Sequence, residues 1–187
     1  MKRRMKLALR VFGLHAGGMV AALFLVPVYG SLWSDNAVFQ WLMTVCIIAV
    51  LAILLFLPIA DQGVKDYMHD EIAQKNATGE APWFAPANGL VAGILSQVPA
   101  LVLLAGSLLL PEAAGGRFLW LPVRGWYFMF SKLMDTWPGA RIWICLGGAA
   151  FTTLISALSY LRGRELRLRT KIIIARNDAK HERKVKK

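Results

Sequence analysis

Four long apolar runs divide the sequence, and each contains about twenty residues with almost no charged side chain. They cover residues 11–33, 37–60, 89–110 and 140–161. A run of roughly twenty apolar residues crosses the hydrocarbon core of a bilayer as one helix, and a helix satisfies its own backbone hydrogen bonds in lipid. The runs are continuous, whereas the strands of a membrane barrel alternate apolar and polar residues. The sequence therefore predicts an all-α, polytopic membrane protein whose residues 1–162 form four transmembrane helices.

The composition supports a membrane protein. Of the 187 residues, 57% are hydrophobic and 18% are charged, whereas about 25% of the residues of a soluble domain are charged. The basic opening MKRRMK and the small residue Gly30 before Ser31 also fit a cleaved signal peptide. The first apolar run is longer than the roughly 7–15 residues of a usual signal-peptide core, so we expect a retained anchor. Cleavage would remove one span and leave the orientation of the others unchanged.

The basic residues are distributed unevenly between the two sides of the predicted membrane. Eighteen of the 22 lie before the first run, between the second and third runs, or after the fourth. The other four are Arg117, Arg124, Lys132 and Arg141. Because basic residues beside spans are retained in the cytoplasm, we expect a multi-pass bacterial plasma-membrane protein with both termini cytoplasmic. Six of the seven tryptophans lie at or near the outer face, where an indole prefers the interface.

Small residues at intervals of four mark three of the predicted spans. Gly13 and Gly17 lie in the first span, Gly89 and Gly93 in the third, and Gly148 in the fourth. Small residues at this spacing let transmembrane helices approach closely. We expect these glycines to pack the four helices into one bundle. The alternative is a dedicated face for a second copy of the chain.

Three polar residues fall at membrane depth, in the predicted cytoplasmic third of the bilayer: His15, Gln97 and Ser156. Polar residues inside a membrane face the bundle interior and mark candidate functional sites. We favour a structural hydrogen-bonded cluster and keep a functional one as the alternative. The spans contain no Asp, Glu, Lys or Arg near their centres, which argues against a carboxylate proton relay and a charge-lined pore. Cys46 and Cys145 lack the spacing of a zinc or redox motif, and we expect them to be small core residues.

Acidic residues gather directly after the second run, around one histidine: Asp61, Asp66, His69, Asp70 and Glu71. Asp66 and Asp70 are four apart and share one face of a helix, beside His69. The cluster lacks the paired spacing of a helical metal site, so we predict no metal and no cofactor. A solvated surface helix is the favoured interpretation, and pairing with the basic tail is the alternative.

The two longest polar segments differ in character. Residues 163–187 form a predicted basic helix with a narrow apolar stripe that includes Leu168 and Ile172. Its basic positions include Arg164, Arg167, Arg169, Lys171 and Arg176. We expect these side chains to contact the anionic inner leaflet or an acidic partner. Nucleic acid is disfavoured, because no aromatic residue follows Tyr160 to stack on bases. Residues 117–131 are too polar to span, and we expect an outer interfacial segment rather than a re-entrant one.

Two short motifs carry a resemblance. Gly63–Asp66 reads GVKD after the second run, and Gly89–Gly93 reads GLVAG before Pro99 in the third. This pattern resembles small uncharacterised four-span membrane proteins of Gram-positive bacteria. Their second span is followed by Gly-x-Lys-Asp, and their third span opens with Gly-Leu-x-x-Gly and carries a proline. Tyr67 departs from the asparagine of that pattern. The resemblance implies the four-span topology and no particular activity.

These patterns favour a non-enzymatic function. The sequence has no phosphate-binding glycine loop, nucleophile elbow or paired histidine site. We therefore expect a membrane subunit, scaffold or accessory factor of a larger assembly, with a protein partner or a second copy of the chain. The first alternative is a small oligomeric transporter or channel that uses His15 and Gln97. The second is a membrane-surface enzyme that uses Asp66, His69 and Asp70.

Overall fold

The structure is a computed structural model that describes residues 2–32, 36–76, 82–110 and 116–185, and these ranges contain helices and no strand. The elements, in chain order, are α1 (Lys2–Leu32), α2 (Ala37–Lys75), α3 (Ala87–Leu109), α4 (Gly116–Trp126), η2 (Phe128–Phe130), α5 (Ser131–Thr136), η3 (Pro138–Ala140) and α6 (Arg141–Val185). Four of them, α1, α2, α3 and α6, are long and apolar enough to cross a membrane. The predicted all-α class with four spanning helices is therefore confirmed.

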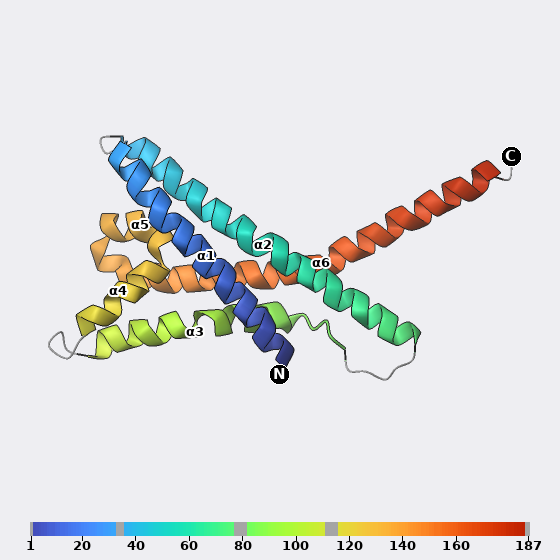
Figure 1. The fold of residues 1–187 in the computed structure, drawn as a ribbon, viewed down its shortest axis with the longest axis horizontal. Coiled ribbons are helices and arrows are strands. Elements are labelled where there is room, and N and C mark those ends of the chain that lie inside the picture. Colours follow the sequence, from blue (N-terminus) through green and yellow to red (C-terminus); the bar gives the residue numbers. More distant parts are fainter. Residues whose placement is uncertain (1, 33–35, 77–81, 111–115, 186–187) are drawn as a thin grey trace.

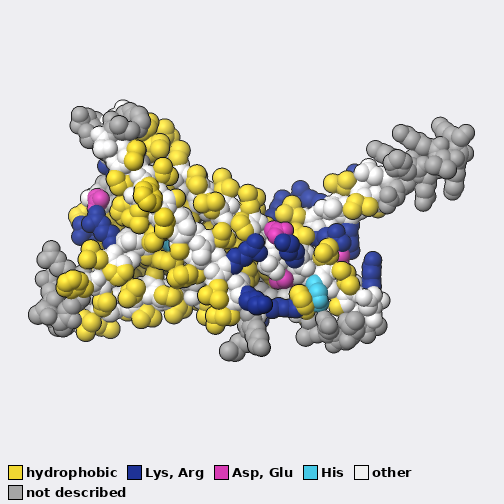
Figure 2. Space-filling view, in the orientation of Figure 1, with side chains coloured by type: hydrophobic (Ala, Val, Ile, Leu, Met, Phe, Trp, Pro, Cys, Tyr) yellow, Lys and Arg dark blue, Asp and Glu magenta, His cyan; other side chains and the backbone are white. Residues whose placement is uncertain are grey.

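The four long helices form a bundle in which α6 packs against both α2 and α3, and α1 packs against α2 and α3 (Figure 1). The start of α1, the end of α2, the start of α3 and the C-terminal part of α6 lie at the same end of the bundle (Figure 1). Lys and Arg side chains gather there (Figure 2), and we call it the basic end. The short helices α4 and α5 lie at the opposite end (Figure 1).

The helices extend well beyond the apolar runs that predicted them. Helix α1 begins at Lys2, and α2 continues through the acidic cluster to Lys75. Helix α6 contains 45 residues, and at 1.5 Å per residue it is about 68 Å long. No break separates the predicted tail from the fourth span, so residues 163–185 continue the same helix. A hydrocarbon core about 30 Å thick covers less than half of α6.

Much of the apolar surface of the spans is left for lipid. In the most apolar window of each long helix, at most 39% of the residues are buried within the chain. Large side chains such as Phe24, Leu57 and Leu154 are more than half exposed, and a yellow apolar surface covers most of the bundle in Figure 2. This exposure is expected of helices whose outer faces contact lipid tails.

Three of the predicted packing glycines lie at helix contacts. A Cβ built on Gly89 or Gly93 would meet the backbone of α6 at 2.7 and 2.8 Å, respectively. A Cβ on Gly148 would meet the aromatic rings of Phe130 and Tyr127, both at 2.9 Å. Small residues let α3 and α6 approach to backbone contact, as predicted.

The prediction for Gly13 and Gly17 as packing residues inside the bundle is wrong. No atom of the described residues lies within 4 Å of a Cβ built at either position. Both glycines are on the face of α1 that points away from the other helices, so the alternative of a face for a second copy stays a prediction.

Among the described residues, the closest approach of two helices is between Gly63 of α2 and Gly163 of α6, and no spacing pattern in the sequence pairs these two glycines. A Cβ on Gly163 would lie 2.5 Å from the Ala60 carbonyl oxygen and 2.6 Å from the Val64 nitrogen. Only glycine allows the two backbones to cross this closely.

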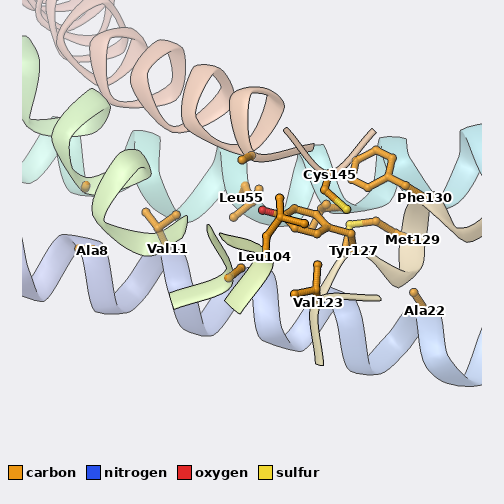
Figure 3. Packing of buried hydrophobic residues seen from close by; sticks show 14 of the residues in the cluster. Ala8, Val11, Ala22, Leu55, Leu104, Val123, Tyr127, Met129, Phe130 and Cys145 are labelled. Atoms are coloured by element: carbon orange, nitrogen blue, oxygen red, sulfur yellow. The ribbon is translucent and has the colours of Figure 1, made fainter. Parts of the chain in front are cut away.

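The predicted interfacial segment differs most from the structure. Helix α4 and η2 enter the bundle, where Val123 and Tyr127 have 0% exposure. Figure 3 shows the Tyr127 ring near Leu104 of α3 and Cys145 of α6. The physical reason is that this segment is amphipathic: Phe118 and Leu121 of α4 stay exposed, while its other side fills the centre of the core. The segment then turns back through α5, so it is a hairpin packed inside the bundle rather than a helix along its surface.

Candidate functional site

A buried polar cluster, formed by His15, Gln97, Trp126, Tyr127 and Thr152, joins α1, α3, α6 and the end of α4. The imidazole of His15 stacks on the indole of Trp126 with ring centroids 4.5 Å apart. Its Nε2 lies 3.1 Å from the Trp126 carbonyl oxygen, and its Nδ1 lies 3.2 Å from the Thr152 hydroxyl. A carbonyl oxygen only accepts, so Nε2 carries a proton and donates to Trp126. The single hydroxyl proton of Thr152 lies within reach of both Nδ1 and the Gly148 carbonyl oxygen, which is 3.0 Å away. His15 is therefore fixed in one orientation.

Gln97 is the acceptor at the centre of the same cluster. Its side-chain oxygen accepts hydrogen bonds from the Trp126 indole at 3.1 Å and from the Tyr127 hydroxyl at 3.2 Å. Its amide donates to Ser96 at 3.3 Å. Gln97 is twelve residues before Leu109, the last residue of α3, which places it roughly 18 Å along the helix from that end. The α4 hairpin therefore contacts α3 far from the C-terminal end of that helix.

The prediction of one cluster from His15, Gln97 and Ser156 holds for the first two residues only. His15 and Gln97 meet through Trp126, whereas the Ser156 hydroxyl donates to the Thr152 carbonyl within α6. The sequence did not indicate that Trp126, Tyr127 and Thr152 belong to this cluster. A sequence does not distinguish an aromatic residue at the membrane interface from one in the core. Only the turn of the hairpin brings Trp126 and Tyr127 to Gln97.

The acidic cluster after the second run is not one site, because its members turn to different partners. Asp66 is 8% exposed, and so it is not part of a solvated face as we expected. Its carboxylate accepts hydrogen bonds from the Tyr160 hydroxyl at 2.7 Å and from the Gln62 amide at 2.8 Å. These two donors satisfy a buried carboxylate that would otherwise be costly.

Asp70 holds the connection between α2 and α3. Its two oxygens accept from the backbone nitrogens of Trp83 and Phe84 at 2.5 and 2.8 Å. The indole of Trp83 then stacks on the imidazole of His69, while Phe84 stacks on Tyr160 with centroids 5.1 Å apart. Asp70 and His69 therefore position a loop, which gives them a structural role at the basic end.

Glu71 pairs with the predicted tail, which confirms the alternative interpretation for this residue. Its carboxylate forms ion pairs with Lys171 and with Arg167, the latter at 3.4 Å. The Glu71 side chain is only 14% exposed, so the pair is better shielded from water than most surface ion pairs. Asp61 pairs with Lys65 one helical turn away at 2.7 Å. The Glu71 pairs join α2 to α6 near the point where α6 leaves the bundle.

The side chains of the acidic cluster are occupied by contacts within the protein. Among the described residues, no group of three or more His, Cys, Asp or Glu side chains could hold a metal ion. The carboxylates of Asp66 and Asp70 are each occupied by two donors, and His69 is stacked against an indole. These groups are arranged to hold helices and a loop together.

We call the part of α6 after Lys171 its projecting part, and residues 172–177 there are all exposed. Beyond Lys171, the consecutive residues Ile172, Ile173 and Ile174 are 55%, 58% and 51% exposed. Arg169 and Arg176 flank them and are exposed as well. This part of α6 extends away from the other helices (Figure 1). An apolar surface among charged residues outside the bundle is typical of a site of interaction.

No family model, curated protein or solved structure matches this chain. The resemblance to small four-span proteins of Gram-positive bacteria therefore stays a prediction, and the function is inferred from the geometry.

Proposed function

We propose that the protein is a non-enzymatic subunit of a larger membrane assembly in a bacterial plasma membrane, with both termini in the cytoplasm. In this proposal the bundle is a fixed support, and the projecting part of α6 binds a partner protein. The observation that carries the proposal is the exposed Ile172–Ile174 segment on a helix that continues far beyond the bundle. The Glu71 ion pairs support it, because they hold this helix in one direction before any partner binds.

The arrangement of the isoleucines favours a protein over the flat surface of a leaflet. Consecutive residues of a helix point about 100° apart, so Ile172 and Ile174 face nearly opposite sides. A helix lying in a membrane interface buries a single apolar face. A protein groove that wraps the helix can cover all three side chains, and an acidic rim on the partner would pair with Arg169 and Arg176.

The test is purification of the full chain from its native membrane in nanodiscs, followed by mass spectrometry of the associated proteins. We expect one stoichiometric partner with the natural chain. The triple variant Ile172→Ser, Ile173→Ser, Ile174→Ser should lose it, while the bundle stays intact. The matched control Thr170→Ala, Asn177→Ala changes polar residues of the same helix and should retain the partner. Equal recovery of the partner by the triple variant, or no stoichiometric partner with the natural chain, would contradict the proposal.

A second candidate function is transport, and the hairpin of α4 and η2 favours it, because segments that enter a membrane and turn back line many transport paths. A groove of about 420 Å³ between α3 and α6 includes Gln97 among otherwise mainly apolar residues. If Gln97 lines a path, Gln97→Leu should abolish flux in reconstituted vesicles, with Ser107→Ala, a part-buried residue of the same helix, as the control. Equal flux by both variants would exclude this candidate.

A further inference from the structure

A second pocket, independent of the α6 segment, opens at the basic end of the bundle. Its volume is about 340 Å³, at the lower end of the roughly 300–1,000 Å³ of pockets for small ligands. Four basic side chains of the first turns of α1 line it: Arg3, Arg4, Lys6 and Arg10. Trp83 and Asn88 line it from the loop before α3 and from its first turn. We call this site the basic pocket.

Among the described residues, the three arginines of the basic pocket have neutral partners. The guanidinium of Arg4 donates to the side-chain oxygen of Asn88 at 3.0 Å, and that of Arg10 donates to the oxygen of Gln62 at 3.0 Å. The guanidinium of Arg3 lies over the ring of Trp83. Within the described ranges, no carboxylate forms an ion pair with these arginines or with Lys6. Neutral partners hold three guanidinium groups in place and leave their charges available.

A chain of hydrogen bonds stabilises the wall behind these arginines. The Gln62 amide that accepts from Arg10 donates to Asp66, and Asp66 accepts from the Tyr160 hydroxyl. Asn88, the partner of Arg4, donates to the same hydroxyl at 3.4 Å. The wall therefore connects α1, α2, α3 and α6. Asp66 is the one carboxylate among the lining residues, and it is already satisfied by two donors.

We propose that the basic pocket binds a phosphate group. Arginine guanidinium groups match the geometry of phosphate oxygens and form strong, charge-assisted hydrogen bonds with them. Several such groups fixed around one cavity form a preorganised site for an anion of about −1 to −2 charge. Basic pockets between transmembrane helices at the inner face of a membrane bind the headgroups of anionic lipids. The phosphate could belong to such a lipid or to a soluble phosphate ester, and these two sources are separated by experiment.

The experiment uses the full chain reconstituted in nanodiscs of phosphatidylcholine. In one arm phosphatidylglycerol is mixed into the bilayer, and its retention by the protein after transfer to detergent is measured by native mass spectrometry. In the other arm glycerol 3-phosphate is added to the phosphatidylcholine discs, and its binding is measured by isothermal titration calorimetry. The pocket variant is Arg4→Gln, Arg10→Gln. The control variant Lys65→Gln, Lys75→Gln removes the same charge from exposed positions of α2 that do not line the pocket.

We expect the natural chain and the control to bind one of the two probes, and the pocket variant to bind it about tenfold to a hundredfold more weakly. Selective retention of phosphatidylglycerol identifies a lipid headgroup, and binding of glycerol 3-phosphate identifies a soluble ester. Lys6→Gln provides a second test if the double variant does not fold, because the Lys6 amine has no hydrogen bond or ion pair with any other described residue. Equal affinity of the pocket variants and the control for both probes, or binding of neither probe by the natural chain, would overturn the proposal.

Discussion

The crossing of α2 and α6 at Gly163 provides the sharpest test of the bundle. In the Gly163→Ala variant, the new methyl group would lie 2.5 and 2.6 Å from two backbone atoms of α2. Ordinary carbon contacts are about 3.5–4.0 Å, so the helices must separate by about 1 Å. Overpacking of this kind costs typically 1–3 kcal/mol, and the upper end applies because backbone atoms cannot move aside as a side chain does. Alanine returns about 1 kcal/mol in helix propensity, so we expect a net loss of about 2 kcal/mol.

Gly17→Ala is the matched control, because the same change on α1 meets no described atom within 4 Å. It should gain up to about 1 kcal/mol from helix propensity. The two variants then differ by about 3 kcal/mol, which corresponds to roughly 6–12 °C in the midpoint of thermal unfolding for a chain of this size. The assay is thermal unfolding in one detergent, followed by tryptophan emission. Equal midpoints would refute the close crossing, and a loss of stability in Gly17→Ala alone would indicate that a second copy packs on that face.

Three further predictions concern the polar contacts. Gln97→Leu leaves two buried donors without an acceptor, so the free energy of unfolding should fall by about 2 kcal/mol or more, measured by titration with a denaturing detergent; an unchanged value would contradict the buried polar cluster. Tyr160→Phe removes one donor from the buried Asp66 carboxylate and should cost about 1–3 kcal/mol in the same assay, whereas no loss would mean that water replaces the hydroxyl. Glu71→Gln should change the free energy of unfolding by no more than about 1 kcal/mol. It should also broaden the distribution of distances between spin labels on α2 and on the projecting part of α6. An unaltered distribution would show that the ion pairs do not orient α6.

The four spans could be predicted from the sequence because crossing a bilayer is a local property of composition and length. The helix ends could not, because polar residues extend a helix once its neighbours hold it, as Glu71 and Lys171 do for α2 and α6. The α6 helix therefore continues through a boundary that the change in composition suggested near residue 162.

The glycines show the limit of a spacing rule. Gly13 and Gly17 have the same interval as Gly89 and Gly93, yet only the second pair meets another helix. The spacing indicates that another helix can approach closely at these positions. Which helix does so depends on the packing of the whole bundle. Gly163 has no second glycine four residues away on α6 that would mark it. The glycine that it meets, Gly63, lies on α2.

The candidate site was predictable in part for a similar reason. Burial of His15 and Gln97 follows from their place inside apolar runs, but their connection through Trp126 depends on a hairpin that the sequence presented as an interfacial segment. Likewise, the basic residues before the first span indicated an orientation, and only the fold brings Arg4 and Arg10 to neutral partners around one cavity.

Site-specific photo-crosslinking in living cells tests the central claim, that the projecting part of α6 binds a partner protein. A photoreactive amino acid would replace Ile173 or, as the control, Leu158, which is equally exposed at 58% on the same helix within its apolar span. The account predicts one discrete crosslinked protein from position 173 and none from position 158, which should face lipid. The absence of a protein crosslink from position 173, or the same products from both positions, would contradict it.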